Sequence, residues 1–260
     1  MATALRILIL GGTTEASALA RLLAGDARFE ATLSLAGRTS TPKPQPIATR
    51  IGGFGGVDGL VHFLRGQAIE AVIDATHPYA DQMSAHAVAA CSRAGVTLAS
   101  LVRTPWTRHA GDRWQAVSTA TAAALALGSR PSRVFLGLGR QELAAFAAAP
   151  QHHYLARVIE PPSPAGLPPD LRILQARGPF DRDAEERLLK NERIEILVSK
   201  NAGGTATYAK IEAARALGLP VIMIERPHKP RGHIVGSAAE AVAWLERHFH
   251  DAASRSLRGV

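Results

Sequence analysis

Five short polar stretches of the chain carry residue types that could bind a ligand or move a proton. The first, GGTTEA at residues 11–16, follows the apolar run LRILIL at residues 5–10. Glycines after a strand let the backbone approach an anion, and the amide groups at the start of the next helix can bind it. The pattern predicts a phosphate-binding loop. The G-x-G-x-x-G spacing of dinucleotide loops is absent, however, and a tight turn with Thr13 as helix cap also fits.

The second stretch, GRTST at residues 37–41, ends the next predicted strand. At this point of a dinucleotide-binding fold, an acidic residue binds the ribose of NAD, whereas an arginine accepts the 2′-phosphate of NADP. The stretch holds no acidic residue, and Arg38 and Thr39 can both donate hydrogen bonds to a phosphate. The first two stretches together favour NADP(H) over NAD, with a solvated surface role for Arg38 as the alternative.

The third and fourth stretches also follow predicted strands. GGFGG, residues 52–56, suits either a flat ring lying close to the backbone or a flexible turn. DATHPYAD, residues 74–81, lies at the carboxyl end of an apolar strand, where ligands bind in parallel sheets. His77 can act as a general acid near neutral pH. We favour a site here over the alternative that Thr76 and His77 cap the next helix.

The fifth stretch, SKNAGGTAT at residues 199–207, combines two glycines with hydroxyl, amide and lysine side chains ahead of a predicted helix. It predicts a second place where backbone amides and a cation bind an anion. Its spacing differs from the G-x-x-x-x-G-K-[ST] of nucleoside triphosphate loops. The sequence also lacks the Tyr-x-x-x-Lys pair of short-chain dehydrogenases and the G-x-S-x-G motif of many hydrolases.

The segments between these stretches predict alternating strands and helices. Short runs such as residues 5–10, 70–75 and 194–199 are apolar along almost their whole length, which is typical of parallel strands covered on both faces. Segments with helical periodicity follow them, for example near residues 14–24 and 207–217. This alternation predicts an α/β protein with doubly wound parallel sheets.

The two halves of the chain resemble each other. IEAVIDATHPYA begins at Ile69 and IEILVSKNAGGT at Ile194, and each runs from a strand into a polar loop. We therefore predict two Rossmann-like lobes with a cleft between them. The predicted domains are a cofactor-binding domain at 1–115, a second domain at 116–250 and a flexible tail at 251–260.

Composition narrows the classes of function. The formal net charge of +8 favours anionic partners, but the basic residues are scattered and aromatic residues make up 5%, which argues against nucleic acid. No apolar run is long enough for a membrane span or a signal peptide, and the chain has one cysteine, so we expect a cytoplasmic protein without disulfides or a metal site. The sequence does not indicate an oligomeric state, and a monomer is plausible.

The motifs ILILGGTTEA, DATHPYA, SKNAGG and VIMIERP, in this order, resemble the precorrin-6A reductases of cobalamin (vitamin B12) biosynthesis. The resemblance extends over about residues 7–245. It implies an NADPH-dependent oxidoreductase that reduces one double bond of the precorrin-6A macrocycle to give precorrin-6B. It also implies two Rossmann-like lobes with the ligands between them. A polyanionic tetrapyrrole suits a basic protein with two anion-binding loops.

Under this resemblance, each motif residue receives an expected role. The residues expected to bind NADPH are Gly11, Gly12, Thr13, Thr14, Glu15, Arg38, Thr39, Gly53 and Thr76. Those expected to bind the tetrapyrrole are Tyr79, Ser199, Lys200, Asn201, Gly203, Gly204, Thr205 and Arg226, with Arg103 and Arg140 as further candidates. His77, Tyr79, Lys200 or a bound water could supply the proton, and Glu15 could instead cap its helix.

Two other functions remain open on the sequence alone. One is a two-lobed binding protein that recognises an anionic ligand without turning it over. The other is a different NADP-dependent dehydrogenase or a nucleotide-sugar epimerase, although the missing Tyr-x-x-x-Lys pair weakens this alternative.

Overall fold

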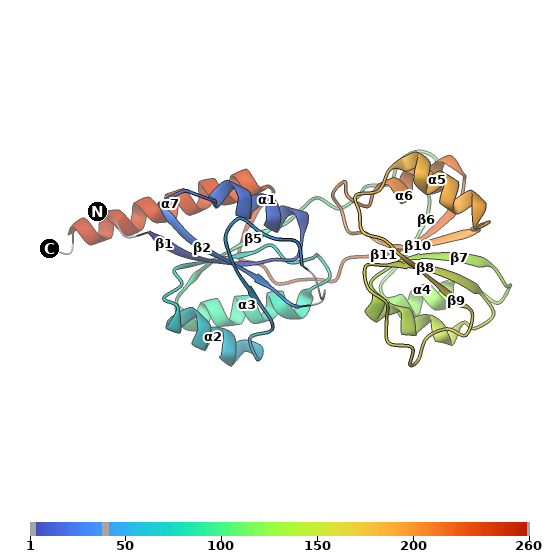
Figure 1. The fold of residues 1–260 in the computed structure, drawn as a ribbon, viewed down its shortest axis with the longest axis horizontal. Coiled ribbons are helices and arrows are strands. Elements are labelled where there is room, and N and C mark those ends of the chain that lie inside the picture. Colours follow the sequence, from blue (N-terminus) through green and yellow to red (C-terminus); the bar gives the residue numbers. More distant parts are fainter. Residues whose placement is uncertain (1–3, 38–41, 259–260) are drawn as a thin grey trace. The chain divides into compact units, whose positions relative to one another are not determined.

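The computed structural model describes residues 4–37 and 42–258, which form two compact α/β units (Figure 1). The first unit comprises the chain up to Thr104 together with the segment from His228 onward, and the second runs from Pro105 to Pro227. Each unit contains a six-stranded sheet in which all neighbouring strands are parallel. The predicted α/β class with two Rossmann-like parallel sheets is therefore confirmed.

The sheet of the first unit has the strand order β12-β5-β4-β1-β2-β3. Its strands are β1 (Leu5–Leu10), β2 (Phe29–Leu35), β3 (Ala48–Ile51), β4 (Ala71–Asp74), β5 (Thr97–Leu101) and β12 (His233–Val235). The helices are α1 (Thr14–Leu23), α2 (Gly56–Gly66), α3 (Asp81–Ala94) and α7 (Ala238–Arg258). Figure 1 shows α1 and α7 on one face of this sheet and α2 and α3 on the other.

Strand β1 is apolar at almost every position because both of its faces are covered. Alternate side chains of a strand point to opposite faces of the sheet. Ile7 and Ile9 accordingly pack in one cluster with α1 and α7, whereas Leu8 and Leu10 pack in another with α2 and α3. All four side chains are at most 2% exposed. This burial fixes the register of the central strand and therefore the position of the loop that follows it.

The sheet of the second unit has the strand order β6-β11-β10-β7-β8-β9. Its strands are β6 (Arg113–Val117), β7 (Arg133–Gly137), β8 (His153–Val158), β9 (Leu171–Gln175), β10 (Ile196–Lys200) and β11 (Pro220–Ile224). The helices are α4 (Ala120–Ala126), the 3₁₀ segment η1 (Arg140–Ala148), α5 (Arg182–Asn191) and α6 (Ala209–Ala216). Helices α5 and α6 cover one face, where Phe135, Leu189 and Ile211 form part of the core.

The domain boundaries differ from those predicted. Residues 228–250 were assigned to the second domain, but β12 pairs with β5, and Trp244 and Leu245 of α7 pack in the core of the first unit. The first boundary lies after Thr104 instead of near residue 115, because β6 joins the second sheet beside β11. Residues 251–258 continue α7, so the predicted tail is not a separate segment over this range.

Both sheets have the strand order 3-2-1-4-5-6 of dinucleotide-binding folds, counted from the central strand of each unit. In the first unit the sixth position is filled by β12, the last strand of the chain. In the second unit it is filled by β6, which comes before the other strands of that sheet in the sequence. The order reverses between β1 and β4 and between β7 and β10. Ligands of such folds bind beyond the carboxyl ends of these strands, and most of the predicted site residues lie there.

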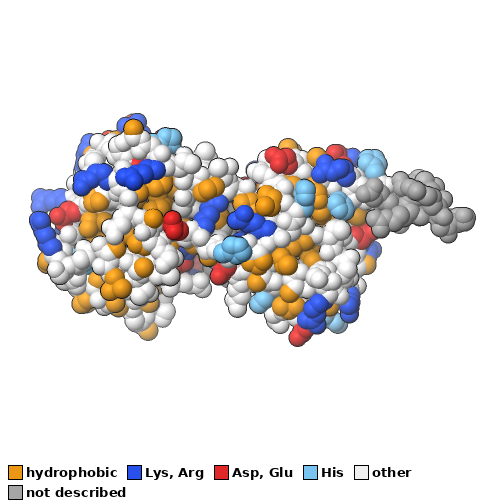
Figure 2. All heavy atoms as spheres, turned by 180° about the vertical axis from the view of Figure 1, so that it is seen from behind, with side chains coloured by type: hydrophobic (Ala, Val, Ile, Leu, Met, Phe, Trp, Pro, Cys, Tyr) orange, Lys and Arg blue, Asp and Glu red, His pale blue; other side chains and the backbone are white. Residues whose placement is uncertain are grey.

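The basic side chains form several separate groups on the face drawn in Figure 2, with acidic side chains between them. Arg38 and Thr39, which were predicted to bind the 2′-phosphate of NADPH, lie outside the described residues. Among the described residues, no helix is both long and apolar enough to span a membrane.

Candidate functional site

The β1–α1 loop is shaped by its two glycines and by Thr13. A Cβ at Gly11 would lie 2.5 Å from Leu33 Cδ1, and Gly12 has a φ of +108°, so both positions favour glycine. Thr13 is the N-cap of α1, since its Oγ1 accepts a hydrogen bond from the amide of Ala16. The same hydroxyl donates to the carbonyl of Ala75 at 2.8 Å. Thr13 therefore ties this loop to the end of β4.

Glu15 is held by an ion pair inside the same unit. Its carboxylate lies 3.2 Å from Nη1 of Arg103, just beyond β5, and it also accepts a hydrogen bond from Thr14 Oγ1 at 3.0 Å. The side chains of Arg103 and Glu15 are only 15% and 23% exposed. Glu15 thus anchors the start of α1 to the end of β5. This contact gives Glu15 a structural role in addition to its predicted cofactor role.

The β4–α3 loop is built on a buried carboxylate. Asp74 is 2% exposed and accepts hydrogen bonds from Thr76 Oγ1 at 2.6 Å, from the Thr76 amide at 3.1 Å and from Ser84 Oγ of α3. Lys229 adds a cation 3.6 Å from Asp74 Oδ2 and donates to Thr76 Oγ1 at 2.9 Å. Asp74 therefore holds the loop in place. The Thr76 hydroxyl donates a hydrogen bond to Asp74 and accepts one from Lys229.

His77 and Tyr79 lie beside each other in this loop. Their ring centroids are 5.6 Å apart, and the amide of Ala80 donates to the carbonyl of His77 at 2.8 Å. The N-cap of α3 is Ala80, which makes no side-chain capping bond. The alternative that Thr76 or His77 caps this helix is therefore wrong. The loop instead presents two titratable rings beyond the carboxyl end of β4.

The glycine-rich stretch at residues 52–56 is held by Arg50 of β3, a residue that the sequence analysis did not identify. Arg50 Nη1 donates to Ser34 Oγ at 2.7 Å and to the Gly52 carbonyl, and Nη2 donates to the Gly53 carbonyl at 3.0 Å. The guanidinium also lies 4.0 Å from the ring centroid of Phe54. A Cβ at Gly52 or Gly53 would meet nothing within 4 Å. The stretch is therefore a fixed loop with open space against its backbone.

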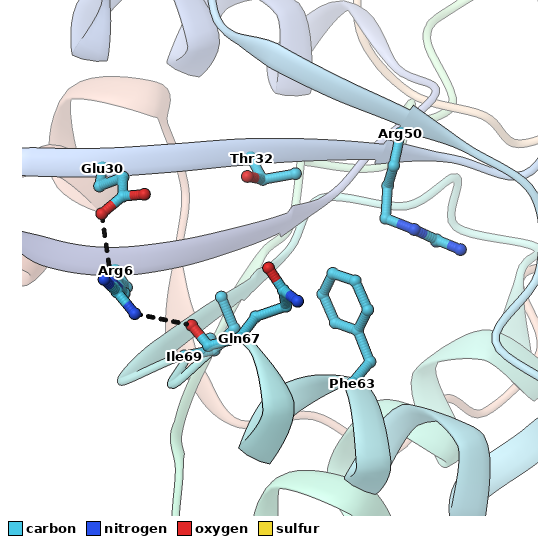
Figure 3. Close-up of a pocket in the computed structure, with 7 residues that line it drawn as sticks. All are labelled: Arg6, Glu30, Thr32, Arg50, Phe63, Gln67 and Ile69. Carbon is cyan, nitrogen blue, oxygen red and sulfur yellow. Dashed lines mark hydrogen bonds and ion pairs between the residues drawn. The ribbon is translucent and has the colours of Figure 1, made fainter.

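The cavity in Figure 3 lies elsewhere on the first unit. It has a volume of about 210 Å³ and extends from the ion pair of Arg6 and Glu30, near the amino ends of β1 and β2, to Arg50 and Phe63. Its lining residues are Arg6, Glu30, Thr32, Arg50, Phe63, Gln67 and Ile69. None of the predicted site residues lines it, but its lining residue Arg50 also donates to the carbonyls of Gly52 and Gly53 in the glycine-rich stretch.

In the second unit, the loop between β10 and α6 is held by Trp106. The backbone amide of Trp106 donates to Asn201 Oδ1 at 2.8 Å, and Asn201 Nδ2 donates back to the Trp106 carbonyl at 3.0 Å. The indole Nε1 donates to the carbonyl of Gly204 at 2.7 Å. Gly203 and Gly204 both have a φ of +68°, which favours glycine. The sequence analysis assigned no role to Trp106, and no motif pattern marks it.

The remaining predicted substrate residues differ in how they are placed. Lys200 forms an ion pair with Glu142 of η1 beyond the reversal point of the sheet. Arg226 donates to the carbonyls of Asn201 at 2.8 Å and Ala202 at 3.1 Å. Ser199 is fully buried and donates to the carbonyl of Lys200, so its burial argues against direct contact with a ligand. The further candidate Arg140 pairs with Glu160.

A buried charged cluster lies beneath this loop. Arg157 of β8 forms a bidentate ion pair with Glu185 of α5, and its guanidinium lies 3.6 Å from the ring centroid of Phe180. Lys210 of α6 donates to the Thr207 carbonyl at 2.7 Å and lies 4.8 Å from the ring centroid of Trp106. Burial, and then the charge of Arg157, lowers the pKa of Lys210 to about 7. Through the contacts of Lys210 with Thr207 and Trp106, the cluster links the core of the second unit to the β10–α6 loop.

Replacing Lys210 with methionine is expected to change stability in a pH-dependent way. The unfolded chain holds the lysine proton up to about pH 10, whereas the folded protein releases it near pH 7. The unfolded state therefore binds more protons between these values, and the wild type gains stability as pH rises through this window. The free energy of unfolding of Lys210→Met should exceed that of the wild type by the largest amount below about pH 7. This difference should shrink towards about pH 10.

Urea unfolding of both proteins across this pH range would measure the effect. Lys190→Met removes an exposed lysine from the neighbouring helix α5 and should give a difference that does not vary with pH. A constant difference between the wild type and Lys210→Met would contradict the depressed pKa of Lys210.

The described residues contain no group of three or more histidine, cysteine, aspartate or glutamate side chains placed to hold a metal ion. Within each unit, the structure brings together loops that lie far apart in the sequence. The first unit joins the β1–α1 and β4–α3 loops through Thr13. The second joins residues 105–106 to the β10–α6 loop. Each pair combines backbone groups with cationic or hydroxyl side chains, as an anion-binding site requires.

Comparisons with known proteins find similarity to precorrin reductases over nearly the whole chain. The sequence model of the family described as precorrin-6x reductase CbiJ/CobK matches residues 6–246. The precorrin-6A reductase of Rhodobacter capsulatus is 54% identical, with 94% of this chain and 96% of that protein covered. That of Mycobacterium tuberculosis is 43% identical, with 92% and 97% covered. The cobalt-precorrin-6A reductase of Salmonella typhimurium is 31% identical, with 85% and 87% covered.

A solved structure of a precorrin-6A reductase is similar to this chain as well. The structure described as CobK precorrin-6A reductase superimposes with a TM-score of 0.89 at 54% sequence identity. The match covers 94% of this chain and 97% of the other. With 94% of this chain covered, the match extends over both units.

Proposed function

The chain belongs to the precorrin-6x reductase family, and on this premise we propose that it reduces precorrin-6A to precorrin-6B with NADPH as hydride donor. It is an oxidoreductase that acts on a tetrapyrrole intermediate of cobalamin biosynthesis. The observation that carries the proposal is the 54% identity to a precorrin-6A reductase over 94% of the chain. The proposed location is the cytoplasm.

The first unit supports a nicotinamide cofactor. A Cβ at Gly12 would meet nothing within 4 Å, as at Gly52 and Gly53, so a flat or extended ligand can approach the backbone at these positions. The start of α1 offers amide groups without helical partners, which suits the pyrophosphate. We assign Gly11, Gly12, Thr13 and Thr14 to the pyrophosphate, and Arg38 and Thr39 to the 2′-phosphate.

The bound cofactor would supply a hydride, and the protein must orient the reactants and allow a proton to reach the reduced ring. We assign the nicotinamide to the neighbourhood of Thr76, His77 and Gly53. Because the Thr76 hydroxyl is already bonded to Asp74 and Lys229, Thr76 would contact the cofactor through its backbone or by exchanging one of these bonds. His77, Tyr79 and Lys200 stay the candidate proton donors.

The second unit supports binding of the carboxylate-bearing substrate. Gly203 and Gly204 have left-handed backbone conformations that can turn consecutive amides towards an anion. Lys200 lies at the start of this loop, and Arg226, just after β11, donates to the carbonyls of Asn201 and Ala202 near the same end, so both add positive charge there. We assign the tetrapyrrole carboxylates to Asn201, Gly203, Gly204, Thr205 and these two side chains, and Tyr79 of the first unit stays a predicted substrate residue.

Replacing Arg38 with alanine is expected to weaken NADPH binding about tenfold or more, because a charge-assisted bond to the 2′-phosphate is lost. NADH has no 2′-phosphate, so its affinity should change less than about twofold. Titration of each nucleotide, followed by nicotinamide fluorescence, measures both dissociation constants. Arg130→Ala, which removes an exposed arginine of the second unit, is the matched control. Equal losses for the two nucleotides would remove Arg38 from the phosphate site.

The experiment that tests the function is a single-turnover assay with purified precorrin-6A and NADPH, following the loss of nicotinamide absorbance and the change in the macrocycle spectrum. Stoichiometric oxidation of NADPH is the expected result. Binding of the tetrapyrrole without NADPH oxidation would instead support the alternative of a binding protein for an anionic ligand.

A further inference from the structure

Lys229 lies in the segment that returns the chain from β11 to β12, and the sequence analysis assigned it no role. Its side chain is 8% exposed. Lys229 Nζ donates to Thr76 Oγ1 at 2.9 Å and to the carbonyl of His77 at 3.4 Å, and lies 3.6 Å from Asp74 Oδ2. All three contacts are with the β4–α3 loop.

These contacts offset the free-energy cost of burying the Lys229 ammonium group. Removing an ammonium group from water is costly unless the charge is paired and its donors are bonded. Burial lowers the pKa of Lys229, while the neighbouring carboxylate of Asp74 opposes that shift. Asp74 is itself buried and fully bonded within the loop, so the two charges depend on each other.

Side chains from other elements also restrain the loop. Ser84 of α3 donates to Asp74, and Thr13 of the β1–α1 loop donates to the carbonyl of Ala75. Lys229 adds a further attachment that reaches both Thr76 and His77. A loop of this kind, between a strand and a helix, tolerates movement unless side chains restrain it.

We propose that Lys229 is a positioning residue of the reductase, which fixes the loop carrying Thr76, His77 and Tyr79 by bridging the Thr76 hydroxyl, the His77 carbonyl and the Asp74 carboxylate. This inference rests on the proposed function, because it assumes that the loop contacts the nicotinamide. Lys229 acts through Thr76 and His77 and does not itself touch the reactants. Small displacements of groups around a reacting centre lower rates strongly, even when their cause lies one residue away.

The test uses the full-length protein and four single variants. Lys229→Met keeps an unbranched apolar stem and removes the ammonium, and Lys190→Met is the control on an exposed lysine. Thr76→Val removes the bridging hydroxyl at nearly constant shape, whereas Thr76→Ser retains it. Steady-state rates with precorrin-6A and NADPH, together with NADPH titration by fluorescence, are measured at a temperature where circular dichroism shows every variant to be folded.

Lys229→Met and Thr76→Val should each lower kcat/KM for NADPH about tenfold or more, and Thr76→Ser and Lys190→Met less than about threefold. The loss of kcat/KM in the double variant Lys229→Met/Thr76→Val should be smaller than the sum of the two single losses, because both changes break the bond between Lys229 Nζ and Thr76 Oγ1. A role in stability alone would leave kcat/KM of the folded Lys229→Met and Thr76→Val proteins near that of the wild type. If Lys229→Met does not fold, the two Thr76 variants test the bridge. A loss of kcat/KM in Thr76→Val that is absent from Thr76→Ser supports it.

Three outcomes would overturn the inference while leaving the function intact. These are wild-type kcat/KM in Lys229→Met, equal losses in the serine and valine variants, or additive losses in the double variant. By contrast, failure of the wild-type protein to bind or oxidise NADPH would overturn the proposed function itself.

Discussion

Replacing Glu185 with glutamine is expected to lower the free energy of unfolding by about 3–5 kcal/mol, because a buried ion pair loses one partner. The Glu185 side chain is 3% exposed and that of Arg157 is 7% exposed. The carboxylate faces two cations, since it pairs with Arg157 and also raises the pKa of Lys210. Glutamine keeps the shape of the side chain but leaves the guanidinium without a counter-charge.

Urea unfolding followed by circular dichroism measures this loss, and hydrogen exchange locates it. Amides of β8 and α5, which carry Arg157 and Glu185, should lose protection before those of the first unit. Glu186→Gln is the control on the same helix, because Glu186 pairs with the exposed side chains of Arg182 and Lys190 and should contribute about 0.5 kcal/mol or less. A loss below about 1 kcal/mol in Glu185→Gln would show that water or a shifted proton compensates for the missing charge.

The elements near the predicted site could be predicted from the sequence because their apolar patterns are simple. Strand β1 is buried on both faces, and the loop after it begins with two glycines: a Cβ at Gly11 would press on the end of the Leu33 side chain, and Gly12 has a positive φ. Loops that follow central parallel strands lie at one edge of a sheet. Grouping the β1–α1 and β4–α3 loops therefore required no knowledge of side-chain contacts.

Other features depended on contacts that a linear pattern does not encode. The short strand β12 and the edge strand β6 carry weak apolar signals, and which sheet each joins is decided by pairing with β5 or β11. The residues that hold the loops, such as Trp106 and Lys229, lie far in sequence from the loops they contact. The proposed roles of the loop residues themselves stay predictions.

Replacing Trp106 with alanine is expected to raise KM for precorrin-6A about tenfold or more and to leave NADPH affinity within about twofold of wild type. The indole donates to the Gly204 carbonyl and packs against Tyr208, with ring centroids 5.4 Å apart, and Lys210 lies over its face. Truncation would free the β10–α6 loop, which we assign to the substrate. The loops that we assign to the cofactor belong to the first unit, whereas Trp106 belongs to the second.

Phenylalanine at position 106 separates packing from hydrogen bonding. It keeps an aromatic ring beside Tyr208 but leaves the Gly204 carbonyl without its donor, which costs about 1–3 kcal/mol. Trp114→Phe is a matched control, because the buried Nε1 of Trp114 has no hydrogen-bond partner among the described residues. That substitution should be neutral or slightly stabilising, since it removes an unpaired donor.

Steady-state kinetics with each reactant varied in turn distinguishes the possible outcomes. A rise in KM for precorrin-6A in both Trp106 variants, larger in alanine, supports a loop held by ring packing and by the bond to Gly204. Equal effects of Trp106→Phe and Trp114→Phe would show that the hydrogen bond to Gly204 contributes nothing specific. A selective loss of NADPH affinity would place the cofactor, and not the tetrapyrrole, on the β10–α6 loop, because Trp106 contacts that loop through Asn201 and Gly204.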